Sequence, residues 1–265
     1  MRGSRSTEPA EGVGDVERVR GVVLAGGTGS RLYPLTKVTN KHLLPVGRYP
    51  MIYYPVAKLV QAQVTDILVV TGPEHMGDVV NLLGSGSAWN ARFTYRVQDD
   101  PGGIAQALAL ARDFAAGGAV VAVLGDNIFD ASIAPFLRRF QGQERGARIL
   151  LKEVPDPERY GVADVRDGHV VGIEEKPAHP RSRLCVTGIY MYDQDVFDVI
   201  ATLRPSGRGE LEISDVNNHY VRAGTLAYDE LPGWWTDAGT LPSLRLANEL
   251  ALGIPEDALP VPKHR

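Results

Sequence analysis

The sequence predicts a three-layer αβα fold of the Rossmann-like type, with a mixed, mostly parallel sheet and an inserted portion in the second half of the chain. Short apolar segments with no polar face alternate with helical patterns in the first half, as in parallel sheets that helices cover on both sides. In the second half the expected strands follow one another more closely, which favours antiparallel pairing. The 44% hydrophobic and 23% charged residues are typical of a globular chain and argue against disorder.

The first half contains four short segments that we expect to form strands. The last of them, Ala119–Leu124, is typical of a strand inside a parallel sheet because neither of its faces is polar. The expected strands are residues 19–25, 66–71, 92–97 and 119–124. Helices are expected at residues 51–63, around Val79 and Leu83, and around Ile104, Leu108 and Ala111.

The second half combines strands, a hairpin and later helices. The Asp167-Gly168 pair indicates a tight hairpin turn between two of the strands. Thr240 can cap a last helix, because its hydroxyl can accept a bond from a backbone N–H of the first turn. The expected strands are residues 148–153, 161–165, 170–175, 184–192 and 225–231, and the expected helices are residues 195–203, residues 213–223 and the segment after Thr240.

No Pro- or Ser-rich linker divides the chain between these elements. We therefore expect one domain at residues 18–252, with a first half at about 18–145 and a second half at about 146–252. Residues 1–17 are polar and charged with no period, and we expect them to form a disordered tail. Residues 253–265 are expected to form a C-terminal tail.

Charge and composition exclude several kinds of partner. The 28 basic residues are outnumbered by 32 acidic residues, so we expect no nucleic-acid partner and no binding to anionic membranes. The longest uncharged stretch, residues 79–91, is 13 residues long, whereas a membrane-spanning helix needs about 20 apolar residues. Cys185 is the single cysteine, so no internal disulfide is expected, and a cytoplasmic location fits.

The segment Leu24–Leu32, LAGGTGSRL, follows the first expected strand. Its three glycines within four positions let backbone N–H groups approach a ligand closely, and such a loop can bind phosphate oxygens. The spacing fits neither the dinucleotide-binding pattern, which would need Gly at position 32, nor the P-loop, which would need Gly-Lys at 31 and 32. The cations Arg31, Lys37 and Lys41 suit a polyphosphate. On glycine content alone, a plain surface turn remains an equal alternative.

Eight ordered blocks extend this signal over residues 20–252. The first is LAGGTGSRLYPLTKVTNKHLLPVGRYPMIYYP, and the others are RVQDDPGGIAQAL (96–108), VLGDNIF (123–129), VPDPERYGVADV (154–165), GIEEKP (172–177), VTGIYMYD (186–193), RGELEISDVN (208–217) and WWTDAGT (234–240). Together they resemble the bacterial sugar-phosphate nucleotidyltransferases, most closely the glucose-1-phosphate thymidylyltransferases. This resemblance implies the nucleotidyltransferase form of the predicted fold, with a nucleotide-binding first half and a sugar-binding second half.

The resemblance implies roles for residues of the first half. It assigns nucleotide binding to Leu24, Gly26, Gly27, Thr28 and Gly29. Arg31 matches the arginine that binds the β- and γ-phosphates and stabilises the departing pyrophosphate, and Lys41 matches a phosphate-binding lysine. His42 departs from the best-known branch of the family, which has Gln there, and we assign it no catalytic role.

Gln98 and Gly103 lie in the block that reads the pyrimidine base in the family. An amide both donates and accepts, which matches the N3–H and O4 edge of thymine. Uracil has the same edge, so these residues leave the choice between dTTP and UTP open.

Two carboxylates, Asp126 and Asp237, match the family's metal ligands, and Asp126 is also counted with the nucleotide-binding residues. Asp126 follows an apolar strand, and ligands of open α/β sheets bind at the carboxyl ends of strands. The resemblance implies that both residues hold one Mg²⁺ on the nucleotide phosphates. Mg²⁺ is commonly held by one or two carboxylates together with phosphate and water.

The second half supplies the sugar-phosphate site that the resemblance implies. Glu175 matches the residue that binds sugar hydroxyls, Lys176 matches a catalytic lysine on the phosphates, and Arg208 matches a second phosphate clamp. The full set of sugar-phosphate-binding residues is Tyr160, Gly161, Glu175, Lys176, Val186, Tyr190, Arg208 and Trp235. Taken without the blocks, Glu175 and Lys176 could equally form an ordinary exposed ion pair.

The resemblance therefore implies that dTTP and α-D-glucose 1-phosphate are joined to give dTDP-glucose and pyrophosphate. Alternatives are the same chemistry with UTP or another sugar 1-phosphate, and a catalytically silent sensor of sugar nucleotides. After Asp237 only 28 residues remain, whereas the long branch of the family continues with helices that help build an allosteric site. We therefore expect weak or no feedback inhibition through such a site, and a homo-oligomer is left open.

Overall fold

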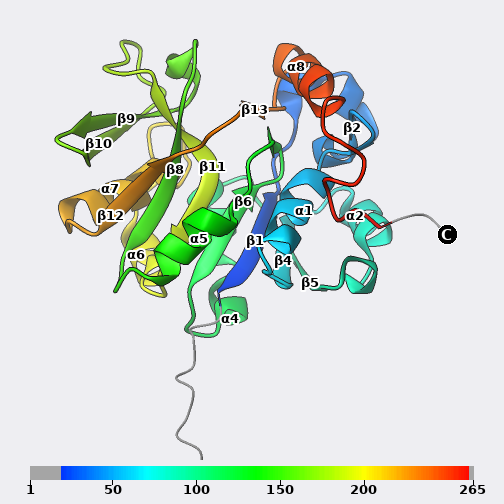
Figure 1. The fold of residues 1–265 in the computed structure, drawn as a ribbon, viewed down its shortest axis with the longest axis horizontal. Coiled ribbons are helices and arrows are strands. Elements are labelled where there is room, and N and C mark those ends of the chain that lie inside the picture. The colour runs from blue at the N-terminus through cyan, green and yellow to red at the C-terminus, as the bar shows by residue number, and fades with distance from the viewer. Residues whose placement is uncertain (1–18, 263–265) are drawn as a thin grey trace, which may run out of the picture.

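Nine strands form one mixed sheet within residues 19–262, which are the residues that the computed structural model describes. Its first half is parallel, with β1 (Arg20–Ala25) between β4 (Asp66–Thr71) and β6 (Val120–Leu124). The strand β5 (Arg92–Val97) pairs with β4 and forms the edge of the sheet (Figure 1). All four predicted strands of the first half are present. The predicted tail at 1–17 lies outside the described residues.

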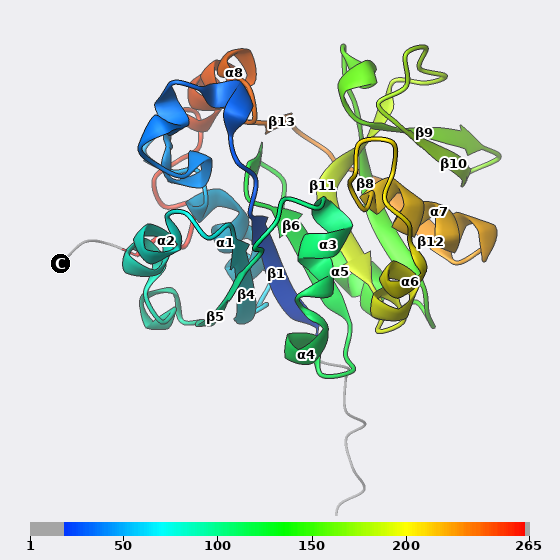
Figure 2. The same cartoon turned by 180° about the vertical axis from the view of Figure 1, so that it is seen from behind.

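Apolar side chains of β1 alternate between the two faces of the sheet and enter two separate cores. Val23 and Ala25 belong to the core under α1 (Tyr53–Gln61) and α2 (Met76–Leu83), which lie on the face seen in Figure 1. Val22 and Leu24 belong to the other core. That face is covered by α3 (Ile104–Ala109), α6 (Val196–Thr202) and α7 (Ile213–Arg222) (Figure 2). The predicted three layers are therefore confirmed.

The sheet continues into the second half through a change of strand direction. The long strand β11 (Leu184–Tyr192) runs antiparallel to β6 and also pairs with β8 (Ala147–Glu153). The hairpin of β9 (Gly161–Arg166) and β10 (His169–Glu175) turns at Asp167 and Gly168, which both have the positive φ values of the predicted tight turn. On the far side of β8 lies β12 (Leu226–Glu230), which is parallel to it. Every strand that the sequence predicted here is present.

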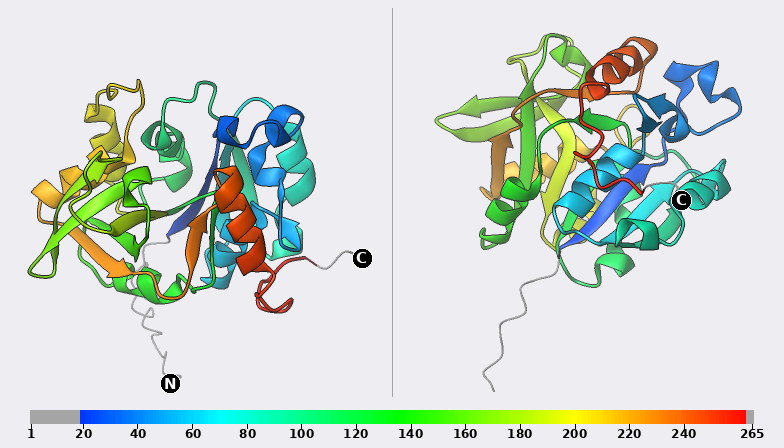
Figure 3. Two further views of the ribbon diagram at one scale, coloured as in Figure 1. Left: turned by 90° about the horizontal axis from the view of Figure 1, so that it is seen from above. Right: turned by 45° about the vertical axis from the view of Figure 1, so that its right-hand side comes forward.

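The chain returns to the first half after β12. The short strand β13 (Trp235–Asp237) pairs with β7 (Asn127–Phe129), and α8 (Leu241–Ala251) packs near β2 (Pro45–Val46), which pairs with β3 (Tyr49–Pro50) (Figure 3). The second half is thus an insertion, as predicted. Thr240 caps α8 through reciprocal hydrogen bonds with Ser243, so the predicted cap is also confirmed.

Some elements differ from the prediction. The helix α5 (Ala134–Gln141), the two three-residue strands β7 and β13, and a set of short 3-10 turns were not expected. The 3-10 turns are Ser30–Leu32, Leu35–Lys37, Lys41–Leu43, Ser87–Trp89 and Pro157–Arg159. The helix expected around residues 104–111 is interrupted at Leu110 and Ala111, and α4 (Arg112–Ala115) follows. In the described part of the C-terminal tail no helix or strand forms, yet Leu259 is buried against the core.

None of the helices in residues 19–262 has the length and apolar character needed to cross a membrane.

Candidate active site

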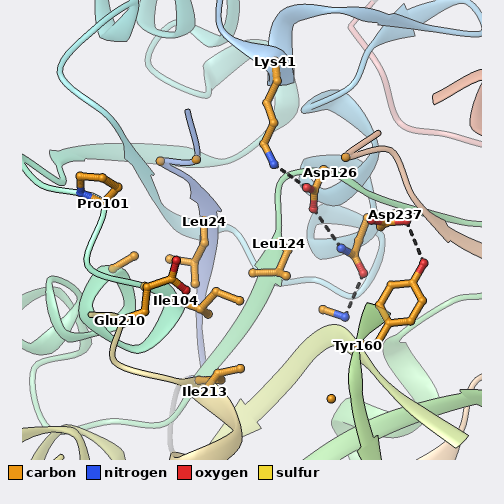
Figure 4. Close-up of a pocket in the computed structure, with 18 of the residues that line it drawn as sticks. Leu24, Lys41, Pro101, Ile104, Leu124, Asp126, Tyr160, Glu210, Ile213 and Asp237 are labelled. Atoms are coloured by element: carbon orange, nitrogen blue, oxygen red, sulfur yellow. Dashed lines mark hydrogen bonds and ion pairs between the residues drawn. The ribbon is translucent and has the colours of Figure 1, made fainter. Parts of the chain in front are cut away.

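A cavity of about 380 Å³ lies between the two halves, at the carboxyl ends of β1 and β6 (Figure 4). Its walls include every residue that the sequence singled out for nucleotide, metal or sugar-phosphate binding except Arg208 and the exposed Lys37. From the first half come Leu24, Gly26, Gly27, Thr28, Gly29, Arg31, Lys41, Gln98, Gly103 and Asp126. Tyr160, Gly161, Glu175, Lys176, Val186 and Tyr190 come from the second half, and Trp235 and Asp237 from the returning strand. The fold therefore brings together residues that lie more than two hundred positions apart in the chain, such as Leu24 and Asp237.

The glycine loop turns sharply between two polar side chains. A Cβ on Gly26 would collide with Gln98 Oε1, and one on Gly27 would lie 3.3 Å from Lys41 Nζ. Gly29 has a φ of +66°, and a Cβ there would lie 2.8 Å from Thr36 Cγ2. A side chain is thus excluded at Gly26 and Gly29 and would be crowded at Gly27, which leaves the backbone at these positions open to the cavity. That arrangement favours phosphate binding over the alternative of a plain surface turn.

Asp126, which follows β6 after Gly125, is paired with Lys41 at an Nζ–Oδ2 distance of 2.5 Å. Asn127 Nδ2 also donates to Asp126 Oδ1, at 3.1 Å. Burial by itself would raise the pKa of Asp126, but the Lys41 ammonium, His42 and these hydrogen bonds bring it well below its ordinary value. Asp126 is therefore a carboxylate at neutral pH, as a metal ligand must be.

Asp237, on β13, is held from the second half of the chain. Arg159 Nη2 lies 3.0 Å from Oδ1 and 3.2 Å from Oδ2, and the Tyr160 hydroxyl donates to Oδ1 at 2.9 Å (Figure 4). Burial and the Asp237 charge raise the pKa of Tyr160 well above its ordinary value, so the phenol keeps its proton. Arg159 also lines the cavity, and the sequence analysis assigned it no role. Arg159 directly precedes Tyr160 in the block VPDPERYGVADV, and this position next to an expected site residue could have identified it from the sequence.

The two carboxylates face one small space above Gly239. A Cβ on this glycine would lie 3.3 Å from Asp237 Oδ2, 3.4 Å from Asp126 Oδ2 and 3.4 Å from Arg31 Nη2. No group of three or more His, Cys, Asp or Glu side chains suited to a metal occurs in the described residues. The chain offers two hard carboxylates at one open point, a donor set that suits Mg²⁺ shared with phosphate and water.

Gln98 is buried, and a neighbouring glutamine orients its amide. Its Nε2 donates to Gly103 O at 3.2 Å and to Gln106 Oε1 at 2.7 Å, while its Oε1 faces Gly26. Gln106 Oε1 also accepts from Gly102 N at 3.0 Å. Gln106 could not be named from the sequence, because it meets Gln98 only when the loop folds back onto α3.

The sugar side of the cavity begins at the end of β10. Glu175 Oε2 accepts a hydrogen bond from Ser214 Oγ at 2.6 Å, and its Oε1 lies 3.6 Å from Lys176 Nζ. Lys176 has a φ of +45°, a conformation that is costly for a residue with a Cβ and that is found preferentially at functional sites. Tyr160 O accepts from the Lys176 backbone N–H at 2.9 Å. The Glu175 carboxylate and the Lys176 ammonium therefore lie at the same wall of the cavity.

Aromatic side chains close the cavity below these charges. Trp235 packs edge-to-face against Tyr160 with ring centroids 5.4 Å apart, and its Nε1 donates to Asn127 Oδ1 at 2.7 Å. Tyr190 and Val186, on β11, are buried and line the same wall. They form an apolar surface beneath the polar groups, which is the usual composition of a small-molecule site.

Arg208 is not among the residues that line the cavity. Its Nη2 binds Glu212 at 2.8 Å, with Glu210 at 3.4 Å and Glu175 at 3.6 Å. Three carboxylates therefore neutralise the guanidinium beside the cavity that Glu175 and Glu210 line, and its assignment as a phosphate clamp stays a prediction.

His42 lies in the cavity wall with an exposed fraction of only 1%. Its Nδ1 is 2.7 Å from Asn40 Oδ1, and a Cβ on Gly125 would come within 2.6 Å of its ring. Burial, and secondarily Lys41, lower the pKa of His42 to about 3. The imidazole is neutral at physiological pH and packs beneath the turn that carries Asp126.

Fold and cavity together define an α/β protein in which a glycine loop, several cations and a pair of carboxylates line one cavity between the two halves. The chain matches the nucleotidyl transferase family over residues 20–252, and it belongs to this family.

Relatives of known name and structure agree with this membership. A glucose-1-phosphate thymidylyltransferase of Xanthomonas campestris is 47% identical over 232 residues, which cover 86% of this chain and 79% of the relative. A provisionally named glucose-1-phosphate thymidylyltransferase from Bacillus anthracis, solved in complex with a sucrose, is 59% identical. It superposes with a TM-score of 0.87, over 89% of this chain and 96% of that one. A UDP-glucose pyrophosphorylase solved with UDP-glucose shares the fold alone, with a TM-score of 0.76 at 21% identity over 88% of this chain and 98% of that one.

Proposed function

We propose that this chain joins dTTP and α-D-glucose 1-phosphate to give dTDP-glucose and pyrophosphate. The observation on which the proposal rests is the convergence of Asp126, Asp237 and Arg31 on one point above Gly239, between the glycine loop and the Glu175–Lys176 wall. A reaction between two phosphate compounds needs a place where their anions meet opposite charge, and there a cation held by the two carboxylates would act together with Arg31. Relatives at 40–47% identity that are named for this reaction support the choice of substrates.

Asp126 and Asp237 would hold one Mg²⁺, and its chemistry when bound is to neutralise phosphate charge and to polarise the phosphoryl oxygens. The backbone of Gly26–Gly29 would bind the nucleotide phosphates. Lys41 lies beside Gly27 and can bind phosphate when it leaves Asp126. Arg31 would stabilise the charge that develops on the departing pyrophosphate.

Glu175 would orient the sugar through its hydroxyls, and Lys176 would bind the phosphate of the sugar. A sugar-phosphate oxygen then attacks the α-phosphorus of the nucleotide in line. The bond to the β-phosphate breaks, and its electron pair leaves with pyrophosphate. The attacking oxygen is already an anion, so no general base is required, and catalysis consists of alignment and charge neutralisation.

The test is release of pyrophosphate from glucose 1-phosphate with dTTP, UTP, CTP, ATP and GTP, each with and without Mg²⁺. Fast release with dTTP, lost when either the sugar phosphate or Mg²⁺ is omitted, would support the proposal. Asp126→Asn and Arg31→Ala are expected to lower turnover by about 10²-fold or more. Equal rates with UTP would change the nucleotide and keep the mechanism, whereas wild-type rates in both variants would refute it.

A further inference from the structure

Arg159 is a cation of the cavity wall with three different partners. Its Nη1 binds Asp156 at 2.6 Å, and its Nη2 binds Asp237 at 3.0 Å. The guanidinium also stacks over the Tyr160 ring, 5.0 Å from the centroid. Asp156 lies outside the cavity lining, whereas Asp237 lies within it. One edge of the guanidinium is thus anchored in the second half, and the other edge points to the proposed metal site.

Each of the two carboxylates that we propose as metal ligands is paired with a cation of the cavity wall. Lys41 is bound to Asp126, and Arg159 is bound to Asp237. Both carboxylates are the proposed metal ligands, so each ligand is neutralised by a cation in the metal-free protein. When a carboxylate turns its oxygens to a metal, its former partner is left as a cation at the edge of a cavity suited to phosphate.

We propose that Arg159 binds phosphoryl oxygens of the substrates, and that it does so in exchange for Asp237 when that carboxylate binds the metal. This inference rests on the proposed function. The guanidinium suits the exchange because it presents several N–H donors in one plane. Asp156 and the Tyr160 ring keep that plane in place while the Nη2 side changes its acceptor.

The position of Arg159 indicates which phosphates it can reach. It precedes Tyr160 and Gly161, which face the sugar side, yet it contacts a carboxylate on the nucleotide side. The ligand is therefore a phosphoryl group where the two substrates meet, either on the nucleotide or on the sugar 1-phosphate. The two sources share one chemistry, and separate titrations distinguish them.

The test uses Arg159→Met with Mn²⁺ as the metal probe, and its readout is binding, not turnover. Free Mn²⁺ is followed by electron paramagnetic resonance, and dTTP and glucose 1-phosphate are each titrated by calorimetry with and without Mn²⁺. We expect Mn²⁺ alone to bind about 3-fold more tightly to the variant, because a competing partly exposed ion pair is gone. With Mn²⁺ present, we expect at least one phosphate ligand to bind about 10-fold more weakly, because a charge-assisted hydrogen bond is lost. Without metal, its affinity should match the wild type.

This combination of opposite effects separates the proposal from a structural role. If Arg159 only held Asp237 in place, the variant would bind Mn²⁺ more weakly. It would also bind the phosphate ligands more weakly, whether Mn²⁺ is present or not. That result would overturn the proposal, and so would an unchanged Mn²⁺ affinity or unchanged phosphate affinities. Arg166→Met is the matched control, because Arg166 lies in the same half, pairs with Asp164 and is 65% exposed. Its binding constants should stay at the wild-type values.

Two further measurements keep the test decisive. If Arg159→Met folds poorly, Arg159→Lys retains a positive charge without the planar fork, and at least a 3-fold loss of metal-dependent phosphate affinity is expected. Unchanged affinity in that variant would overturn the proposal. Asp126→Asn tests the proposed function separately. If wild type and Asp126→Asn bind Mn²⁺ with dTTP equally well, the metal site itself is wrong, whatever Arg159 does.

Discussion

Gly239→Ala is the substitution that tests the proposed metal site most directly. The added methyl would lie 3.3 Å from Asp237 Oδ2 and 3.4 Å from both Asp126 Oδ2 and Arg31 Nη2. It would thus fill the space on which the three charged groups converge, without removing any of them. The effect on function therefore reports on that space and not on the loss of a charge.

The magnitude follows from these distances. Mg²⁺ holds its oxygen ligands at about 2.0–2.1 Å and tolerates little distortion, so a carbon at this point competes with the ion or with the phosphate oxygen beside it. We expect kcat/KM to fall by about 10²-fold or more, the loss typical of removing one strong electrostatic contact from a transition state. The free energy of unfolding should change by less than about 1 kcal/mol, since the contacts are only slightly tight and the backbone is outside the left-handed region.

The assay is pyrophosphate release as a function of Mg²⁺ concentration, combined with urea unfolding of the same preparation. Gly172→Ala is the control, because nothing lies within 4 Å of the Cβ that it would introduce. If Gly239→Ala retained a rate within about 3-fold of wild type and the same Mg²⁺ dependence, the space above Gly239 would not be the place where metal and phosphate meet.

Three further outcomes follow from the structure. Burial lowers the pKa of His42 from 6.5 to about 3. As the pH falls, the imidazole is therefore protonated in the unfolded chain before it is protonated in the folded one. The free energy of unfolding should consequently drop by roughly 2 kcal/mol between pH 6.5 and 5. Urea unfolding of His42→Gln should show a smaller drop. Both Lys176→Gly and Lys176→Ala should lose activity, but thermal unfolding should find the glycine variant more stable by about 1 kcal/mol, because position 176 has a positive φ. Equal stabilities would contradict this. Arg208→Met should raise the KM for glucose 1-phosphate by about 10-fold and leave the KM for dTTP unchanged, because the guanidinium would leave Glu212 to bind the sugar phosphate during turnover. An unchanged KM for glucose 1-phosphate would show that Arg208 does not bind this phosphate.

Local signals were sufficient for most of the regular elements. The apolar runs at β4 and β6 are strands because they have no polar face to expose, and this property lies within five or six consecutive residues. The turn at Asp167 and Gly168 and the Thr240 cap were equally local. By contrast, β7 and β13 have three residues each and are strands only because they pair with each other across the chain.

The candidate site shows the same division. The glycine loop and Asp126 could be placed from the sequence, because both follow apolar strands whose carboxyl ends form ligand sites. Arg159 and Gln106 were missed, since their partners Asp237 and Gln98 approach them only in the folded chain. Arg208 was assigned to the phosphate from its block alone; the structure adds three carboxylate partners, and the assignment stays a prediction.

The sequence by itself determined the family, the order of the strands along the chain and the residue types that face the cavity, because each depends on nearby residues or on a linear series of blocks. Only the tertiary structure decided which cation pairs with which carboxylate in the cavity. Coulomb energy depends on the distance between groups in space, and Lys41 and Arg159 reach their carboxylates across 85 and 78 positions of the chain. The pairing of cations with metal-binding carboxylates is therefore a property of the fold, and no linear pattern encodes it.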